Sequence, residues 1–98
     1  MIVRIGSTQI PPERVDELVS RYRETVRPIH ERCHGLRHHY VLVDREGGEV
    51  MVVGLWDSSE ALEEALPTLE PVRDSLWAHF ESAPTLKAFE LADELGNP

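Results

Sequence analysis

Residues 49–56, EVMVVGLW, constrain the fold more than any other stretch of this chain. In an extended strand, successive side chains point to opposite faces. Both faces of this one are apolar: Val50, Val52 and Trp56 lie on one, and Met51, Val53 and Leu55 on the other. A strand that is apolar on both faces must be covered on both sides. Helices can cover one side, so a second layer must cover the other.

Hydrophobic periodicity predicts the elements of the first half. Residues 2–10 are rich in β-branched types and end at two prolines, which is typical of a strand. Apolar residues then recur at steps of three and four, which predicts a helix that Pro28 kinks or shortens. Residues 36–44 and 49–56, joined by the glycine-containing link 45–48, predict an antiparallel hairpin.

The second half predicts one more helix and one more strand. Asp57 or Ser58 can cap the helix, because short polar side chains accept hydrogen bonds from free N–H groups at a helix start. Pro67 and Pro71 interrupt the helical pattern, so we expect two segments with a bend near these prolines. Residues 85–93 predict the last strand.

The order β-α-β-β-α-β predicts an α+β, ferredoxin-like fold, in which two helices cover one face of a four-stranded antiparallel sheet. At 98 residues the chain has room for one such domain, over residues 1–98. The open sheet face needs a cover, and the simplest cover is a second copy of the chain. We therefore expect a homodimer.

Composition and charge exclude several classes of function. A net charge of −8, with a single lysine, argues against binding nucleic acid. The single cysteine cannot form an intrachain disulfide. The N-terminal residues have no signal-peptide pattern, and no apolar run approaches the ~20 residues that span a bilayer. The expectation is a cytoplasmic protein that does not bind membranes.

Residues 30–40, HERCHGLRHHY, gather four of the five histidines and the only cysteine. The spacing does not supply the four converging ligands of a structural metal site, so no metal is expected. His38 and His39 are neighbours on a strand and point to opposite faces. Whichever faces the helices could, beside Tyr40, accept a proton from a bound phenol. The alternative is a histidine that only forms hydrogen bonds at an interface or sheet edge.

Three stretches, CHGLRHHYVLVD (33–44), VGLWDSSEAL (53–62) and LKAFEL (86–91), together resemble the antibiotic biosynthesis monooxygenase family of dimeric α/β barrels. The most specific part of this resemblance is the W-x-S-x-E-A-L pattern that begins at Trp56. The family includes cofactor-independent oxygenases of quinol-like and anthrone-like aromatics, and haem-degrading enzymes. Anthrone-type members carry an asparagine four residues before the tryptophan, where this chain has Val52.

The resemblance implies a ligand pocket between the helices and the sheet. We expect a small apolar aromatic ligand and no cofactor, with His38 or His39 as the base, Tyr40 as a hydrogen-bonding group and Trp56 as a wall. Further lining residues are then Tyr22, Leu62, Leu76 and His79. Two alternatives stay open: haem binding or degradation with His79 as the iron ligand, and a ligand-binding module without catalysis.

Overall fold

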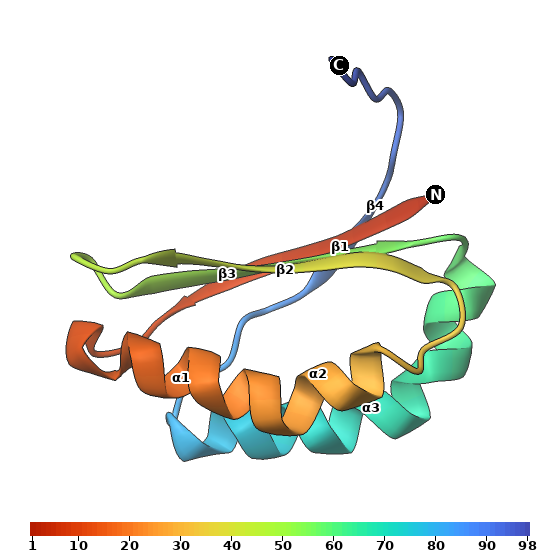
Figure 1. The fold of residues 1–98 in the computed structure, drawn as a ribbon. Coiled ribbons are helices and arrows are strands. Elements are labelled where there is room, and N and C mark those ends of the chain that lie inside the picture. Colours follow the sequence, from red (N-terminus) through yellow and green to blue (C-terminus); the bar gives the residue numbers. More distant parts are fainter.

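The computed structural model describes all residues from Met1 to Pro98. Its four strands are β1 (Ile2–Gln9), β2 (Leu36–Asp44), β3 (Glu49–Trp56) and β4 (Lys87–Glu90). They form one antiparallel sheet in the order β2-β3-β1-β4. All the helices lie on one face of this sheet, and the other face carries none (Figure 1). The predicted α+β, ferredoxin-like fold is confirmed.

The first helical region is one run of turns with an irregular middle. It consists of η1 (Pro12–Arg14), α1 (Val15–Arg21), the π-helical turn η2 (Tyr22–Val26) and α2 (Arg27–His30). In η2 the Arg27 N–H donates to the carbonyl of Tyr22, five residues back. Of the two alternatives predicted for Pro28, shortening of the helix was wrong, because α2 continues past the proline to His30 and the wider turn precedes it. Such π turns are frequent at functional sites.

The second helix, α3, runs unbroken from Ser59 to His79. Ser58 caps it, since its Oγ accepts a hydrogen bond from the Ala61 N–H at 3.1 Å. Pro67 and Pro71 lie inside the helix, so the prediction of two separate segments was wrong. The predicted bend is present, because α3 changes direction between its green start and its blue end (Figure 1).

The last strand is shorter than predicted, with Lys87–Glu90 in place of residues 85–93. It pairs with the first half of β1, from Ile2 to Ile5. The carbonyl of Thr85 passes so close to Gly6 that a Cβ atom there would lie 2.5 Å from it. The chain therefore crosses over β1 at this point instead of pairing alongside it.

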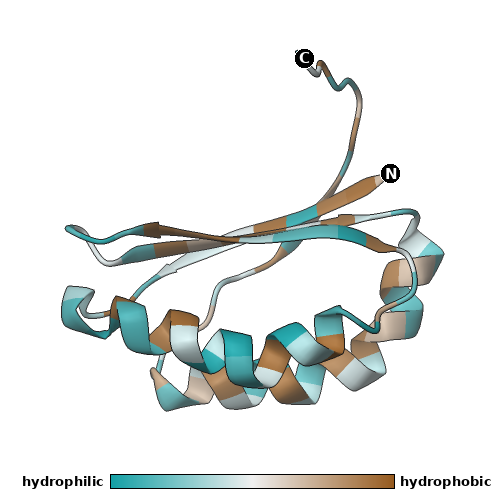
Figure 2. Ribbon diagram, in the orientation of Figure 1, coloured by the Kyte–Doolittle hydropathy of each residue, from teal (hydrophilic) through white to brown (hydrophobic).

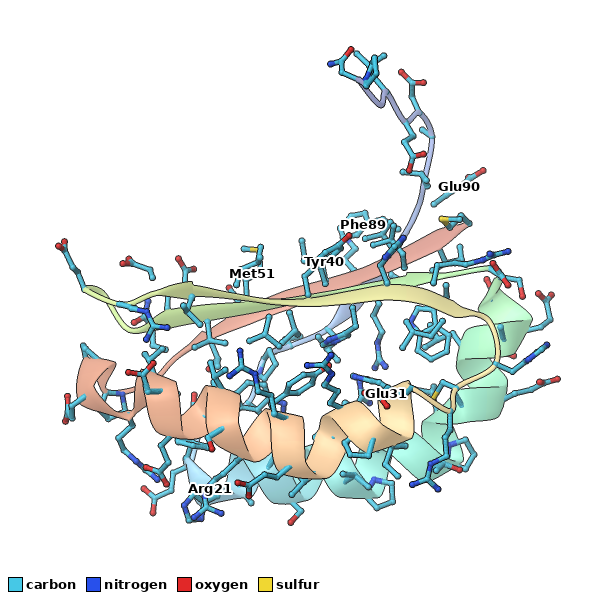
Figure 3. The ribbon with its side chains drawn as sticks, viewed as in Figure 1. Arg21, Glu31, Tyr40, Met51, Phe89 and Glu90 are labelled. Carbon is cyan, nitrogen blue, oxygen red and sulfur yellow. The ribbon has the colours of Figure 1, made fainter.

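The two faces of the sheet differ sharply in burial. Toward the helices, Val50 and Trp56 of β3 are buried with residues of α1 and α3. On the open face, Tyr40, Leu42 and Phe89 remain 47–48% exposed. Figure 3 shows Tyr40, Met51 and Phe89 projecting away from the helices. The helices alternate hydrophobic and hydrophilic stretches, as one-sided packing requires (Figure 2). None of the helices combines the length and apolarity required to cross a bilayer.

Candidate functional site

A β-bulge in β2 decides which histidine faces the helices. The pairing of β2 with β3 shifts register between Leu36 and His38, which leaves Arg37 as the extra residue. Leu36 therefore faces the helices, and so does His39. In a regular strand two residues three positions apart would point to opposite faces. His38 and Tyr40 point to the open face, where their rings stack with centroids 5.9 Å apart. Alternation along the strand puts the two candidate bases on opposite sides of the sheet, and the bulge brings His39, not His38, onto the same side as Leu36.

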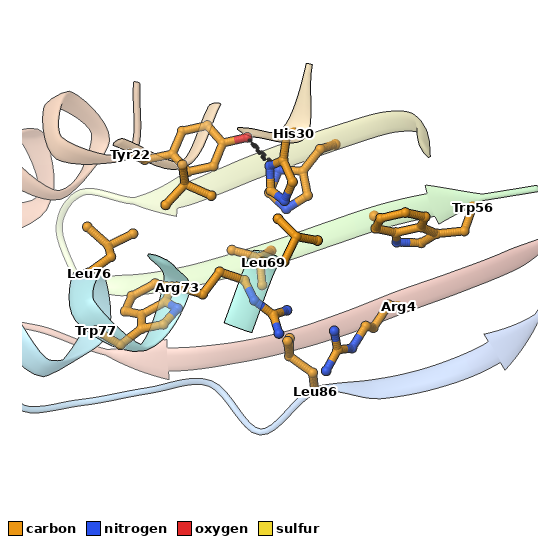
Figure 4. Close-up of a pocket in the computed structure, with 13 residues that line it drawn as sticks. Arg4, Tyr22, His30, Trp56, Leu69, Arg73, Leu76, Trp77 and Leu86 are labelled. Carbon is orange, nitrogen blue, oxygen red and sulfur yellow. Dashed lines mark hydrogen bonds between the residues drawn. The ribbon is translucent and has the colours of Figure 1, made fainter. Parts of the chain in front are cut away.

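A cavity of about 40 Å³ lies between the sheet and the helices, beneath His39. Its walls are mainly apolar and include Val52, Trp56, Leu69, Leu76 and Trp77. Polar side chains occur at two places in the wall, a Tyr22–His30–His39 cluster and a pair of arginines (Figure 4). The family resemblance implied a pocket in this layer, and the fold provides one.

The cluster joins three elements through one hydroxyl. The Oη of Tyr22, in η2, lies 2.9 Å from Nδ1 of His30, in α2, and 2.9 Å from Nδ1 of His39, in β2. The two imidazole rings lie 4.1 Å apart between centroids. A hydroxyl donates a single hydrogen, so one Nδ1 accepts it and the other donates its own N–H to the oxygen. The imidazole that donates at Nδ1 then has an unprotonated Nε2, which can act as a base.

Burial keeps both histidines of the cluster neutral. His30 is only 8% exposed. Desolvation, with smaller contributions from His39 and Arg73, lowers the pKa of His30 to about 3. Desolvation and the positive charge of Arg73 lower the pKa of His39 to about 4. Burial also raises the pKa of Tyr22 to about 12, so its hydroxyl stays protonated. At neutral pH the cluster is an uncharged hydrogen-bonded chain.

The cluster also borders an open groove of about 460 Å³ on its other side. This groove runs along the edge strand β2 and the first helical region, past Arg27, Arg37 and Val41. Its size falls in the ~300–1,000 Å³ range of small-molecule sites. The inner cavity is much smaller than the ~150 Å³ of an engineered cavity that binds benzene. An aromatic ligand in the inner layer must therefore displace part of the wall, and the side chains that border both cavity and groove are Tyr22, His30 and His39.

The arginines, Arg4 of β1 and Arg73 of α3, line the cavity on the side away from the histidines. In Figure 4 their guanidinium groups point toward each other above Leu86. Neither arginine forms an ion pair in this structure. The sheet order places His39 toward the β2 edge and Arg4 toward the β4 edge.

The remaining predicted site residues are divided between the cavity and other surfaces. Tyr22, Trp56 and Leu76 line the cavity. Leu62 is buried in a second apolar cluster with Trp56 and Leu69. His79 lies at the exposed end of α3, where its Nε2 is 2.9 Å from Oε2 of Glu17. His79 therefore faces away from the cavity, and it does not fit the role of an iron ligand for a haem bound there.

Three residues of the site were missed by sequence reasoning: His30, Arg4 and Arg73. His30 follows Tyr22 by eight positions, about two helical turns, and this spacing could have placed both on one face. The two arginines fall on the inward faces of different elements, and only the tertiary fold brings them together. No three histidine, cysteine, aspartate or glutamate side chains converge to hold a metal ion, and the Sγ of Cys33 donates to the carbonyl of Ile29.

Several solved structures share this fold across nearly the whole chain. A monooxygenase from the gene ActVA-Orf6 of Streptomyces coelicolor, in complex with Nanaomycin D, has a TM-score of 0.82 and 14% identity, covering 99% of this chain and 92% of that one. A mutant of SnoaB, a cofactor-independent oxygenase from Streptomyces nogalater, has a TM-score of 0.77 and 20% identity, covering 98% of this chain and 97% of that one. A mutant of MhuD with bound manganese protoporphyrin IX has a TM-score of 0.74 and 20% identity, covering 99% of this chain and 100% of that one. At these identities the similarity establishes the fold.

Sequence comparison adds the family. The uncharacterized proteins MT2634 and Rv2557, from two strains of Mycobacterium tuberculosis, are each 26% identical to this chain over 89 residues. The match covers 91% of this chain but 40% of each relative, so the chain spans about two fifths of the length of these curated relatives. The family model described as antibiotic biosynthesis monooxygenase matches residues 1–70, well over half of the chain. The chain therefore belongs to the antibiotic biosynthesis monooxygenase family.

Proposed function

We propose that this chain is a cofactor-independent oxygenase of a small phenol-type or quinol-type aromatic, with His39 as the base. One observation carries the proposal: a neutral His39, hydrogen-bonded through Tyr22 to His30, lies in the wall of an apolar cavity that Trp56 also lines. A neutral imidazole that is oriented through one ring nitrogen can accept a proton at the other. Nδ1 of His39 is hydrogen-bonded to Oη of Tyr22, so Nε2 is the ring nitrogen available to a substrate.

The proton has a defined path through the cluster. In the tautomer that leaves Nε2 of His39 unprotonated, this atom accepts the hydroxyl proton of the substrate. Nδ1 of His39 can then pass its hydrogen to Oη of Tyr22, which passes its own to Nδ1 of His30. Burial lowers the pKa of His30, which favours return of the proton along the same path to reduced oxygen.

The reaction needs no redox group from the protein, because the substrate anion itself reduces dioxygen. One electron passes from the anion to dioxygen, and the resulting radical and superoxide combine into a carbon–oxygen bond. The peroxide takes up the proton, and its O–O bond then breaks as the C–H bond of the oxygenated carbon is lost, so that the released hydroxide and this second proton leave as water. A phenol with an unsubstituted ortho or para position and one dioxygen thus give one quinone and one water. Trp56 and Trp77 exclude solvent from the intermediate.

A homodimer is the proposed working form. The open sheet face exposes Tyr40, Leu42 and Phe89, each by nearly half, over a surface that no helix covers. Removing apolar area of this kind from water is favourable by roughly 25 cal/mol per Å², and the entropy lost on association offsets part of this gain. Light scattering on the purified protein is expected to give twice the chain mass, and Leu42→Glu is expected to give the mass of one chain. A monomeric wild type would contradict this form.

Oxygen uptake tests the proposed reaction. Purified protein, treated with a chelator, is assayed against naphthols, anthrones and quinols in an oxygen-electrode cell. We expect uptake that the chelator does not remove. His39→Ala is expected to lower kcat by about a hundredfold or more, the usual contribution of a general base. The exposed His34, outside the cluster, provides the matched control, and His34→Ala is expected to keep full activity.

Two results would refute the proposal. Tight binding of these compounds without any oxygen uptake would identify a ligand-binding module. Uptake that is equal in wild type and His39→Ala would remove the histidine as the base. A Soret band in the protein as purified would instead point to haem, for which His79 is not placed to serve as a ligand in the cavity.

A further inference from the structure

Two positively charged side chains face each other in the wall of the cavity without any negatively charged partner in contact. Nη1 of Arg4 and Nε of Arg73 are buried from solvent and have no hydrogen-bond partner. The two arginines come from β1 and α3, and both line the cavity (Figure 4). A buried donor without an acceptor, and a buried charge without a counter-ion, are both costly to a folded protein.

The surroundings of the pair confirm that it lacks a partner. Burial lowers the pKa of both guanidinium groups, and the charge of Arg4 further lowers the pKa of Arg73. The charge of Glu70 raises the pKa of both arginines, and the charge of Asp74 raises that of Arg73. No carboxylate, however, lies within ion-pair distance of either arginine. The unpaired N–H groups are therefore free to bind an anion.

We propose that Arg4 and Arg73 form a subsite for the carboxylate of the substrate, so that the ligand is an aromatic hydroxy acid. This inference rests on the proposed function, because it specifies the substrate class of the same site. Guanidinium groups match carboxylates in shape and bind them through paired N–H donors. A carboxylate between the two groups satisfies the unpaired donors and offsets the repulsion between the two charges.

The order of the strands gives the separation of the backbones that carry the two ends of this site. His39 is on β2 and Arg4 is on β1, and β3 lies between these strands. Neighbouring strands are about 4.8 Å apart, so the two backbones are separated by roughly 10 Å. A fused two-ring aromatic with a hydroxyl at one end and a carboxylate at the other spans such a distance. Its hydroxyl would lie at His39 and its carboxylate at the arginines.

The arginine end is also accessible from outside. A second groove, of about 210 Å³, is lined by Arg4, Arg73, Trp77 and Leu86 together with Glu70. The same guanidinium groups thus border both the inner cavity and this groove. A carboxylate can retain contact with water through the groove while the rings are held in the apolar layer.

Calorimetric titration under anaerobic conditions tests the subsite without turnover. The probe is 6-hydroxy-2-naphthoate, and its matched neutral counterpart is 6-hydroxy-2-naphthamide. We expect the carboxylate to bind at least tenfold more tightly, the size of one hydrogen bond to a charged group. Arg4→Gln and Arg73→Gln should each weaken binding of the carboxylate about tenfold and leave that of the amide unchanged. Arg32→Gln removes the same charge from an exposed position outside the cavity and should change neither.

Each contrary outcome has a distinct meaning. Equal affinities of carboxylate and amide for the wild type, or equal losses of both in the two variants, would overturn the subsite. Acetate that binds as tightly as the naphthoate would overturn the aromatic-acid assignment and leave a plain anion site. A protein that prefers the carboxylate but consumes no oxygen would refute the oxygenase and retain the subsite. Oxygen uptake with no preference for the carboxylate would refute the subsite and retain the oxygenase.

Discussion

Mild acid should destabilise this protein, because its folded state holds two histidines neutral. The pKa values of His30 and His39 are lowered from 6.5 to about 3 and about 4. In the unfolded chain both imidazoles take up protons as the pH falls below about 6.5. The folded protein binds neither proton until the pH approaches 4. Between these values the unfolded state binds more protons, so stability falls as the pH falls.

The magnitude follows from the width of this window. Each histidine contributes about 1.4 kcal/mol per pH unit while only its unfolded form is protonated. Between pH 6.5 and pH 5 this amounts to about 2 kcal/mol per histidine, and about 4 kcal/mol for the two. The free energy of unfolding of a typical domain is only ~5–15 kcal/mol. The loss at pH 5 should therefore remove a large part of the stability.

Urea denaturation at pH 7.5, 6.5, 5.5 and 5.0 measures this loss. Trp56 and Trp77, the only two tryptophans, both line the cavity and report unfolding by fluorescence. Replacing both cluster histidines by glutamine should flatten the profile, whereas the exposed His34→Gln should not. An unfolding free energy that is equal at pH 7.5 and 5.0 would refute the reasoning. So would an unchanged slope in the double variant.

Two further predictions concern stability. Arg73→Met should raise the unfolding free energy of the ligand-free protein by about 1 kcal/mol, because it removes a half-buried, unpaired charge whose cost solvent partly screens. An equal or lower value in thermal denaturation would show that the guanidinium is already compensated. Ser58→Ala should cost about 1 kcal/mol, since the Ala61 N–H loses its cap, and Ser59→Ala, one position further on, is the control for the same assay. Equal losses in the two serine variants would exclude the cap.

The fold could be predicted from sequence because its signals are local. The two apolar faces of β3 required cover on both sides, and the changes of period marked each strand and helix in turn. The errors arose where tertiary contacts overrode local preference. Pro67 and Pro71 bend α3 without breaking it, because packing of this helix against the sheet keeps the remaining turns together.

The site could be predicted only in part, since its geometry depends on one inserted residue and on distant contacts. Alternation along β2 did not show whether His38 or His39 faces the helices, and the bulge at Arg37 decides between them. His30 was not predicted as a site residue, because the π turn that carries Tyr22 and the position of β2 are not local signals. Arg4 and Arg73 are more than sixty positions apart, and nothing in either neighbourhood marks them as a pair.

The energetics explain why a base and two cations would share one cavity. A simple phenol has a pKa near 10, and His39 has a pKa of about 4, so proton transfer between them is unfavourable by about 8 kcal/mol. A turnover of ~10 per second tolerates a total barrier of about 16 kcal/mol, which leaves about 8 kcal/mol for electron transfer to dioxygen. The apolar surroundings that keep His39 free of solvent protons are also what make it a weak base. Positive charge at the far end of the cavity lowers the energy of the substrate phenolate more than that of the phenol, whereas the charge of Arg73 also lowers the pKa of His39. In the proposed site the arginines therefore favour the anionic form of the substrate, while burial and the charge of Arg73 keep the histidine unprotonated before the substrate binds.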